Sequence, residues 1–347
     1  MLTRRTALAG LTAIAGLGLA RPGAAAALPD EADWARVVEA AKKEGEVSFY
    51  SSGIARMEEP LMKQFEDRYG IKVRYARPGG GEIVVRKYET EAEAGRPQVD
   101  VMTLTDTALA LYLEDKSLLA PVAVPNMGRL APQVKADNPL IAPSGLFGLV
   151  IAYNTRMLTP ERAPRSYADL ANPAYKSQIL LGAPENAGST TLLIKAWLDL
   201  YGWDFVEKLR ANDVSEMRLQ AEAMQAVARG EKAICVVAQS WAFTNIAQGA
   251  PVAIVWPTDG TVIADGSLVI ARNAPHPNAA RVFLNHVLSA EYQAAIVKAT
   301  GIFGSAAGMT PPPGIPPLDT LKIIRPDSRQ LAAQRGEMLD RWRKLMG

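Results

Sequence analysis

The chain has 347 residues, with 38 lysines and arginines against 36 aspartates and glutamates, and a single cysteine. Its basic residues are dispersed and form no basic run, which argues against a nucleic-acid-binding protein. A chain of this length exceeds the size at which a single hydrophobic core stops growing, so we expect two lobes.

The first 27 residues have the pattern of a cleavable secretory signal. Arg4 and Arg5 precede an apolar segment, and Ala26 and Ala27 lie at a cleavage site of the Ala-x-Ala type. The arginine pair also resembles a twin-arginine signal, so either export route fits. No cysteine lies directly after the cleavage region, and no other apolar run approaches the roughly 20 residues that span a bilayer. We therefore expect an exported periplasmic protein that is not a lipoprotein.

Three strand–helix units occupy the first part of the mature chain. Apolar residues at helical spacing predict helices that begin after Asp30, near Pro60 and after a glycine-rich loop, and apolar runs predict strands at 46–50, 71–75 and 99–104. Such units build a parallel sheet with helices on both faces, and ligands bind beyond the carboxyl ends of its strands. We therefore expect one rim of the sheet to hold Ser51, Ser52, Gly80, Gly81 and Thr105.

The middle of the chain alternates between buried strands and helices. A proline-rich segment at 121–143 is expected to cover the core or to pass between the lobes, and strands are predicted at 148–155 and 230–238. Tyr153 lies near the end of the first strand, and an amphipathic helix is predicted at 215–228. The second strand leads into the polar and aromatic residues Gln239, Ser240 and Trp241.

The last part of the chain closes the fold. A strand at 252–256 leads to a turn that contains Asp259, and a strand pair or ribbon is predicted over 263–272 around Asp265-Gly266. Two helices are predicted over 277–299, and a proline-rich tether leads to a C-terminal helix. The cysteine, Cys235, lies in an apolar run, so we expect a buried and inert thiol.

The stretch 182–197 connects a strand at 179–181 to a helix with one buried face. The loop between them carries Asn186, Gly188, Ser189 and Thr190. Asn and Ser cap helices by accepting a bond from an unpaired first-turn N–H, and the remaining N–H groups at the positive end of the helix dipole favour an anion. An ordinary capped helix has the same pattern, so anion binding and simple capping are both open for this loop.

Several stretches resemble one family across nearly the whole mature length. They are 47–52, 91–97 with 99–101, 152–155, 167–173, 257–260, 279–284 and 289–293. In order and spacing they are similar to the periplasmic solute-binding proteins of ABC importers, in the branch that contains ferric-ion, phosphonate, thiamine and sugar-phosphate binders.

The resemblance implies an α/β fold of two lobes, the type II periplasmic-binding-protein fold, with two mainly parallel sheets flanked by helices and joined by crossover strands at a hinge. We expect one lobe in 28–120 plus 258–305, and the other lobe with the C-terminal helix in 121–257 plus 306–347. The resemblance further implies that the lobes close over one small-molecule solute and that a monomer then docks on an inner-membrane ABC permease. A sensor or scavenger would use the same closing cleft and stays an alternative.

Ferric binders of this branch place adjacent tyrosines just after the second crossover strand, where phenolates bind the metal. This chain has Gln239-Ser240-Trp241 at that position and no tyrosine. The resemblance therefore implies a small anionic or polar organic solute, such as a phosphate ester, a phosphonate or a carboxylate, with no cofactor and no protein-held metal. Ferric ion held through a synergistic anion, without the tyrosine pair, is the alternative.

The expected ligand-binding set combines the loops of both lobes. It consists of Ser51, Ser52, Gly80, Gly81, Thr105, Tyr153, Asn186, Gly188, Ser189, Thr190, Gln239, Ser240, Trp241 and Asp259. Arg77 would add a bidentate clamp, or be a solvated surface arginine. Glu82 would accept an ammonium or hydroxyl group, or simply favour its helix N-terminus. Tyr153 and Trp241 fit a cleft wall or a core position equally well.

A secreted hydrolase is the alternative from another class. The two histidines, His276 and His286, have no paired metal-ligand spacing, and we expect surface or packing roles for both. The sequence contains no G-x-S-x-G, C-x-x-C, H-E-x-x-H or phosphate-loop motif. Ser189 as a nucleophile would need a nearby base that the sequence does not offer, so we expect a protein without enzymatic activity.

Overall fold

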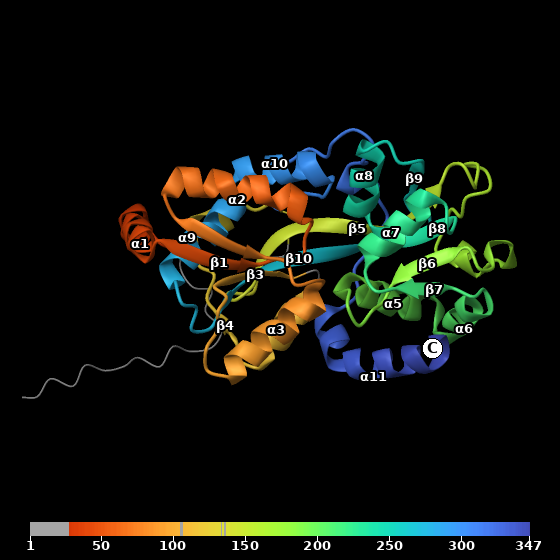
Figure 1. Cartoon of the computed structure of the whole chain (residues 1–347), viewed down its shortest axis with the longest axis horizontal. Coiled ribbons are helices and arrows are strands. Elements are labelled where there is room, and N and C mark those ends of the chain that lie inside the picture. Colours follow the sequence, from red (N-terminus) through yellow and green to blue (C-terminus); the bar gives the residue numbers. More distant parts are fainter. Residues whose placement is uncertain (1–27, 105–106, 133, 135–136) are drawn as a thin grey trace, which may run out of the picture.

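The computed structural model describes residues 28–104, 107–132, 134 and 137–347, apart from the side chains of residues 56 and 57. The expected signal at 1–27 and Thr105 lie outside the described residues. The described chain is an elongated α/β molecule in which helices cover both faces of a long sheet (Figure 1). None of its described helices combines the length and hydropathy needed to cross a bilayer.

The first part of the chain forms three parallel strands with helices around them, and we call these elements the first unit. They are α1 (Glu31–Glu44), β1 (Glu46–Tyr50), α2 (Ala55–Tyr69), β2 (Lys72–Ala76), α3 (Gly81–Glu93), β3 (Val101–Leu104) and α4 (Thr107–Asp115). Asp30 caps α1 by accepting a bond from the N–H of Asp33, and Gly45 and Gly70 end α1 and α2 with φ of 74° and 68°. β1 pairs in parallel with β2 and β3, which confirms the predicted strand–helix order.

The middle of the chain forms a second set of strands and helices, which we call the second unit. It comprises β6 (Ile179–Gly182), α5 (Gly188–Tyr201), α6 (Trp203–Ala211), β7 (Ser215–Met217), α7 (Gln220–Arg229), β8 (Ile234–Ala238), α8 (Gln239–Ala247) and β9 (Val252–Val255). The helix predicted over 215–228 is a short strand followed by a helix, because β7 pairs in parallel with β6. Cys235 is buried in β8 as predicted, and burial raises the pKa of its thiol.

Two long strands, β5 (Ala142–Asn154) and β10 (Thr261–Ala271), join the two units. They are antiparallel to each other, while β10 also pairs with β3 and β5 with β8. The predicted α/β class and crossover strands are therefore confirmed. Hydrogen bonding runs through the crossing strands and links the two expected sheets into one 11-stranded sheet of order β2-β1-β3-β10-β5-β8-β6-β7, with β4, β9 and β11 paired at its sides.

β10 is one continuous strand, so the prediction of a strand pair there was wrong. Asp265-Gly266 makes no turn, because the register with β5 shifts at a bulge between Gly266 and Ser267. Gly266 lies opposite Gly145, and a Cβ on Gly266 would lie 2.5 Å from the hydroxyl oxygen of Ser144. A side chain at position 266 would displace the hydroxyl of Ser144, so the glycine allows the two crossing strands to approach each other closely here.

The C-terminal part of the chain returns to the first unit and then runs along both units. α9 (Pro277–Val287) packs on α1, and α10 (Ala290–Thr300) packs on α2. α11 (Ser328–Met346) lies against α4 of the first unit and against α5 and α6 of the second (Figure 1). The short elements are β4 (Leu119–Ala120), η1 (Pro125–Arg129), η2 (Ala168–Ala171), η3 (Pro173–Tyr175), η4 (Leu318–Thr320) and β11 (Ile323–Ile324).

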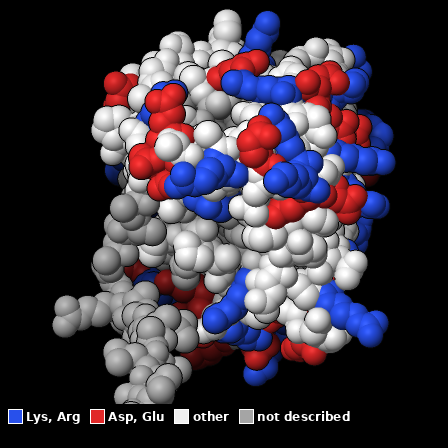
Figure 2. Space-filling view, turned by 90° about the vertical axis from the view of Figure 1, so that its left-hand side faces the viewer, with Lys and Arg blue, Asp and Glu red and all other residues white. Residues whose placement is uncertain are grey.

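Aromatic side chains mark the interior of each unit. In the first unit Phe283 packs on Phe49 and Phe65, with ring centroids 4.9 and 5.1 Å apart. In the second unit Trp197 packs edge-on against Phe205 at 5.5 Å. On the outside, acidic and basic side chains are interspersed on the end of the molecule that Figure 2 shows, in keeping with their dispersed pattern in the sequence.

Candidate functional site

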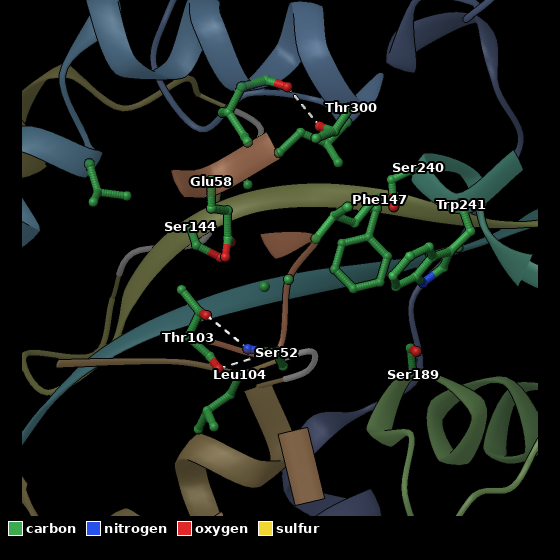
Figure 3. A pocket seen from close by; sticks show the side chains of 18 of the residues that line it. Ser52, Glu58, Thr103, Leu104, Ser144, Phe147, Ser189, Ser240, Trp241 and Thr300 are labelled. Atoms are coloured by element: carbon green, nitrogen blue, oxygen red, sulfur yellow. Dashed lines mark hydrogen bonds between the residues drawn. The ribbon is translucent and has the colours of Figure 1, made fainter. Parts of the chain in front are cut away.

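A cavity of about 140 Å³ lies where the two units meet. Its walls come from the loop before α2, the end of β3, the crossing strands, the first turns of α5 and α8, and α10 (Figure 3). The polar residues that line it include Ser52, Glu58, Thr103, Ser144, Ser189, Gln220, Ser240 and Thr300. Leu104, Phe147, Trp241 and Ile302 contribute apolar surface. The cavity therefore offers many neutral hydrogen-bonding groups and an apolar wall.

Three helices begin at this cavity, namely α2, α5 and α8. Their N-cap residues, Ile54, Ala187 and Ala238, provide no side-chain cap bond. Elsewhere α1, α10 and α11 are capped by Asp30, Ser289 and Asp327, whereas α3, α6, α7 and α9 also lack a side-chain cap, so a missing cap is not particular to the cavity. First-turn N–H groups without a side-chain cap, together with the helix dipole, give the cavity a positive potential that suits an anion.

The first turn of α5 is held in place by Gln220 of α7. The amide nitrogen of Gln220 donates to the hydroxyls of Ser189 and Thr190, both at 3.0 Å. Its amide oxygen accepts from the backbone N–H of Ala238, just before α8, at 2.9 Å. The sequence prediction that Asn186 or Ser189 caps α5 was wrong, because Ala187 occupies the N-cap position and Ser189 lies inside the first turn. Gln220 itself was not predicted.

An aromatic wall lies on the side of the second unit. Trp241 and Phe147 face the cavity next to Ser240 (Figure 3). Arg77, at the end of β2, donates to the backbone oxygen of Gly53 and lies with its guanidinium carbon 6.0 Å from the centre of the Trp241 ring. Arg77 therefore links the loop before α2 to the aromatic wall and is not a solvated surface arginine.

The loop after β1 forms a hydrogen-bonded rim with the end of β3. Ser52 lines the cavity, and its hydroxyl donates to the backbone oxygen of Thr103 at 3.1 Å. Ser51 is fully buried behind it, where its hydroxyl oxygen accepts from Thr103 at 3.0 Å and from the backbone N–H of Gly53 at 2.9 Å. Of these two predicted residues, only Ser52 reaches the cavity, and Ser51 supports the loop from behind.

Glu58, which sequence reasoning missed, projects from the first turn of α2 into this rim. Its carboxylate accepts a hydrogen bond from the hydroxyl of Tyr75 at 2.9 Å. Burial raises the pKa of this carboxyl, while hydrogen bonds from Ser51 and Tyr75 and the charge of Arg77 act to lower it. An acidic residue in a first helical turn is common for electrostatic reasons alone, so nothing in the local sequence indicates that Glu58 faces a cavity.

Four predicted residues mark a contact between the two units beside the cavity. Gly80 is the N-cap of α3 and Gly81 its first residue, while Gly188 begins α5. A Cβ on Gly80 would lie 1.9 Å from the backbone oxygen of Asn186. The side-chain oxygen of Asn186 accepts from Arg86 of α3 at 3.4 Å. These residues bring α3 against the loop before α5, and none of the four lines the cavity itself.

Three other predicted residues have partners within the protein. Tyr153 is buried in the core of the second unit. Gln239 donates to the backbone oxygen of Gly301 at 2.6 Å and accepts from the backbone N–H of Gly148. Asp259 accepts from the hydroxyl of Tyr201 at 2.5 Å and from the backbone N–H of residue 168 at 3.0 Å. None of the three lines the cavity.

Glu82, for which both a ligand contact and a helix-dipole role were open, is paired within the protein. Its carboxylate forms an ion pair with Arg335 of α11, and both side chains are only 13% exposed. Among the described residues, no cluster of three or more histidine, cysteine, aspartate or glutamate side chains is arranged to hold a metal ion. His276 contacts Asp100 at 3.0 Å and His286 packs against aromatic rings, and neither histidine lines the cavity.

Comparisons with known proteins agree with this architecture. A curated relative from Haemophilus influenzae, named "Uncharacterized protein", is 24% identical over 321 residues, which cover 87% of this chain and 91% of the relative. A "Putative 2-aminoethylphosphonate-binding periplasmic protein" of Salmonella paratyphi A is 26% identical over 248 residues, covering 66% and 68%. The solved structure of the periplasmic binding protein AfuA from Actinobacillus pleuropneumoniae, with exogenous fructose-6-phosphate bound, superposes with a TM-score of 0.80 at 24% identity, covering 87% of this chain and 98% of that one.

The family model is decisive for the identity of the chain. The model described as bacterial extracellular solute-binding protein matches residues 97–324. This range runs from the last strand of the first unit, through the crossing strands and the second unit, to the strand before α11. The chain therefore belongs to the bacterial extracellular solute-binding proteins, and it has the fold of the periplasmic binding proteins.

Proposed function

We propose that the protein is the periplasmic substrate-binding component of an ABC importer, and that it captures a small organic solute with an acid group in the cavity between two lobes. The observation that carries this proposal is the convergence of α2, α5 and α8, from both units, with their first turns on one cavity. The family consists of binding proteins and not of enzymes, so we propose capture without turnover.

Neutral donors and helix N-termini support an acid group of the solute. Among the described residues that line the cavity, none is lysine, arginine or histidine. A phosphate, phosphonate or carboxylate would therefore be bound by backbone N–H groups and by hydroxyls such as those of Ser189 and Ser240.

Closure of the lobes over the solute is the second part of the proposal. We assign residues 28–120 plus 258–305 to one lobe and 121–257 plus 306–347 to the other. A solute that contacts both lobes favours the closed arrangement by its differential affinity. The bulge at Gly266 and the close approach to Gly145 give the crossing strands a natural place to bend.

Native mass spectrometry of the mature protein, purified rapidly without added ligand, tests the proposed function. We expect a retained organic acid, whose binding is then measured by calorimetry with the purified compound. Incubation with phosphate and carboxylate esters serves as the control for turnover, and we expect no product. Iron retained without any organic anion, or hydrolysis of an ester, would contradict the proposal.

A further inference from the structure

The cavity contains one buried acidic side chain that the proposed capture of an acid does not use. Glu58 is only 8% exposed, yet it lines the cavity together with Gly53 and Ile54. A Cβ at position 53 would lie 2.1 Å from one carboxylate oxygen of Glu58. Because residue 53 is a glycine and has no Cβ, the carboxylate of Glu58 can occupy this space.

The neighbours of Glu58 are hydroxyl groups and one cation. Tyr75 of β2 donates to it at 2.9 Å, and the hydroxyl of Ser51 also faces it. The positive charge of Arg77 acts to lower the pKa of Glu58. The negative charge of Glu58 acts in turn to raise the pKa of the buried phenol of Tyr292 on α10. Arg77 itself contacts Gly53 and Trp241, so it is shared with other groups.

Among the described residues that line the cavity, Glu58 is the only one with a carboxyl, amino, guanidinium or imidazole group. A carboxylate held away from water is costly unless a cation or several donors compensate it. Hydrogen bonds from Tyr75 and Ser51 compensate only part of this cost, and a cationic group of a bound solute would compensate more. The carboxylate thus forms a negative pole inside a cavity whose other walls favour an anion.

The two poles lie on opposite sides of the cavity. Figure 3 shows Glu58 beside Ser144 on one side, and Ser240 and Ser189, at the starts of α8 and α5, on the other. Phe147 and Trp241 lie between and beside these poles and offer apolar surface. A short hydrocarbon segment that joins a cationic to an anionic group matches this arrangement.

We propose that the solute is a short zwitterion, whose protonated amine binds the carboxylate of Glu58 while its acid group binds at the starts of α5 and α8. This inference rests on the proposed function and narrows its substrate class to acids that also carry an amine. A sugar phosphate or a simple carboxylic acid has no group that would pair with Glu58 as an ion. Glu58 is therefore the residue that we expect to select for the amine.

Calorimetry with three phosphonates of nearly equal size tests the inference. The probes are 2-aminoethylphosphonate, 2-hydroxyethylphosphonate and ethylphosphonate. We expect the wild-type protein to bind the amine at least roughly tenfold more tightly than the other two, as a charge-assisted hydrogen bond allows. We expect E58Q, which keeps the side-chain shape, to bind all three within about threefold of one another. E59Q is the matched control, because Glu59 is the next residue of α2 and is exposed, and it should retain the preference.

The dependence on pH separates direct pairing from a structural role of Glu58. Protonation of Glu58 should abolish the preference for the amine in the wild-type protein, at a pH above the ordinary range of a glutamate, because burial raises its pKa. E58Q should show no such change. Binding of the phosphonates without a preference for the amine, or a preference that persists in E58Q, would overturn the inference and leave the proposed function intact. Binding of no acid by the wild-type protein would overturn both.

Discussion

At the scale of single residues, Gln220 determines how the cavity presents its hydroxyl groups. Its amide joins Ser189 and Thr190, in the first turn of α5, to the backbone N–H of Ala238 at the end of β8. A hydroxyl that accepts one hydrogen bond still has its own proton to donate. Ser189 lines the cavity, whereas Thr190 does not, so Gln220 leaves the proton of Ser189 available to an anion.

Replacing Ser189 by alanine should therefore weaken binding of the cognate solute by about 1–3 kcal/mol, the cost of an unmet hydrogen bond to a buried group. Stability should change little, because Gln220 keeps its bond to Thr190. T190S is the matched control, since it retains the hydroxyl at the neighbouring position. Calorimetry gives both affinities, and an unchanged dissociation constant for S189A would make this loop an ordinary helix start.

His286, which does not line the cavity, should make stability depend on pH. It packs against the rings of Phe65, Tyr69 and Tyr292 and is 3% exposed. Burial lowers its pKa to about 4, helped by the charge of Arg68 and opposed by that of Glu291. The unfolded chain binds a proton near pH 6.5 and the folded protein does not, so the contribution of His286 is complete above about pH 6.5 and is lost as the pH falls towards 4.

Replacing His286 by phenylalanine should flatten the pH dependence of stability between about pH 4 and 6.5. The difference between wild type and variant over this window should approach about 3 kcal/mol. Urea unfolding at several pH values gives the two curves, and nuclear magnetic resonance of the imidazole gives the folded pKa directly. Parallel curves, or a folded pKa near 6.5, would contradict the buried neutral form.

At the scale of elements, α11 connects the two units from outside the sheet. Arg335 pairs with Glu82 of α3 and also donates to the hydroxyl of Thr191 in α5 at 3.3 Å. Further along, Trp342 donates to Glu216 of β7 at 2.6 Å. Burial lowers the pKa of Arg335 to about 10, which leaves the guanidinium charged at neutral pH. The C-terminal helix thus contacts both units through partly buried polar bonds.

Removing one partner of the buried pair should be costly. E82Q leaves the charge of Arg335 buried and should lower the free energy of unfolding by about 3 kcal/mol. R329A, on the same helix, removes an exposed arginine that pairs with Glu114 and Asp115, and should cost less than about 1 kcal/mol. Urea unfolding of both variants measures the contrast. Equal losses of unfolding free energy would mean that breaking the buried pair costs no more than breaking an exposed one.

At the scale of the whole molecule, local patterns predicted the elements, and long-range contacts determined the cavity. The strand–helix units of the first half follow from hydrophobic periodicity, which acts within a few residues. The continuous β10 was missed, because Asp265-Gly266 looks like a turn until its pairing with β5 is known. Glu58 and Gln220 were missed for the same reason: each has its functional neighbours on other elements, and nothing in its own segment distinguishes it from a helix-surface residue.

Gly80, which was predicted from a loop pattern, lies at a contact between the two units. It belongs to the first unit, and its Cα approaches the backbone oxygen of Asn186 in the second unit so closely that a Cβ would lie 1.9 Å from that oxygen. Its φ of −74° and ψ of 174° suit alanine as well as glycine. Alanine at this position would therefore leave the first unit unstrained and would obstruct only its contact with the second.

G80A should consequently fold normally and close poorly. We expect its affinity for the cognate solute to fall at least about tenfold, because relief of such an overlap typically costs 1–3 kcal/mol and about 1.4 kcal/mol is a factor of ten. Small-angle scattering should show that a saturating solute compacts the wild-type protein and not G80A. G336A is the matched control, since Gly336 lies on α11 with no atom within 4 Å of a new Cβ. Full compaction of G80A would mean that the approach of α3 to the loop before α5 is no part of closure, and that the solute draws the lobes together through the cavity walls alone.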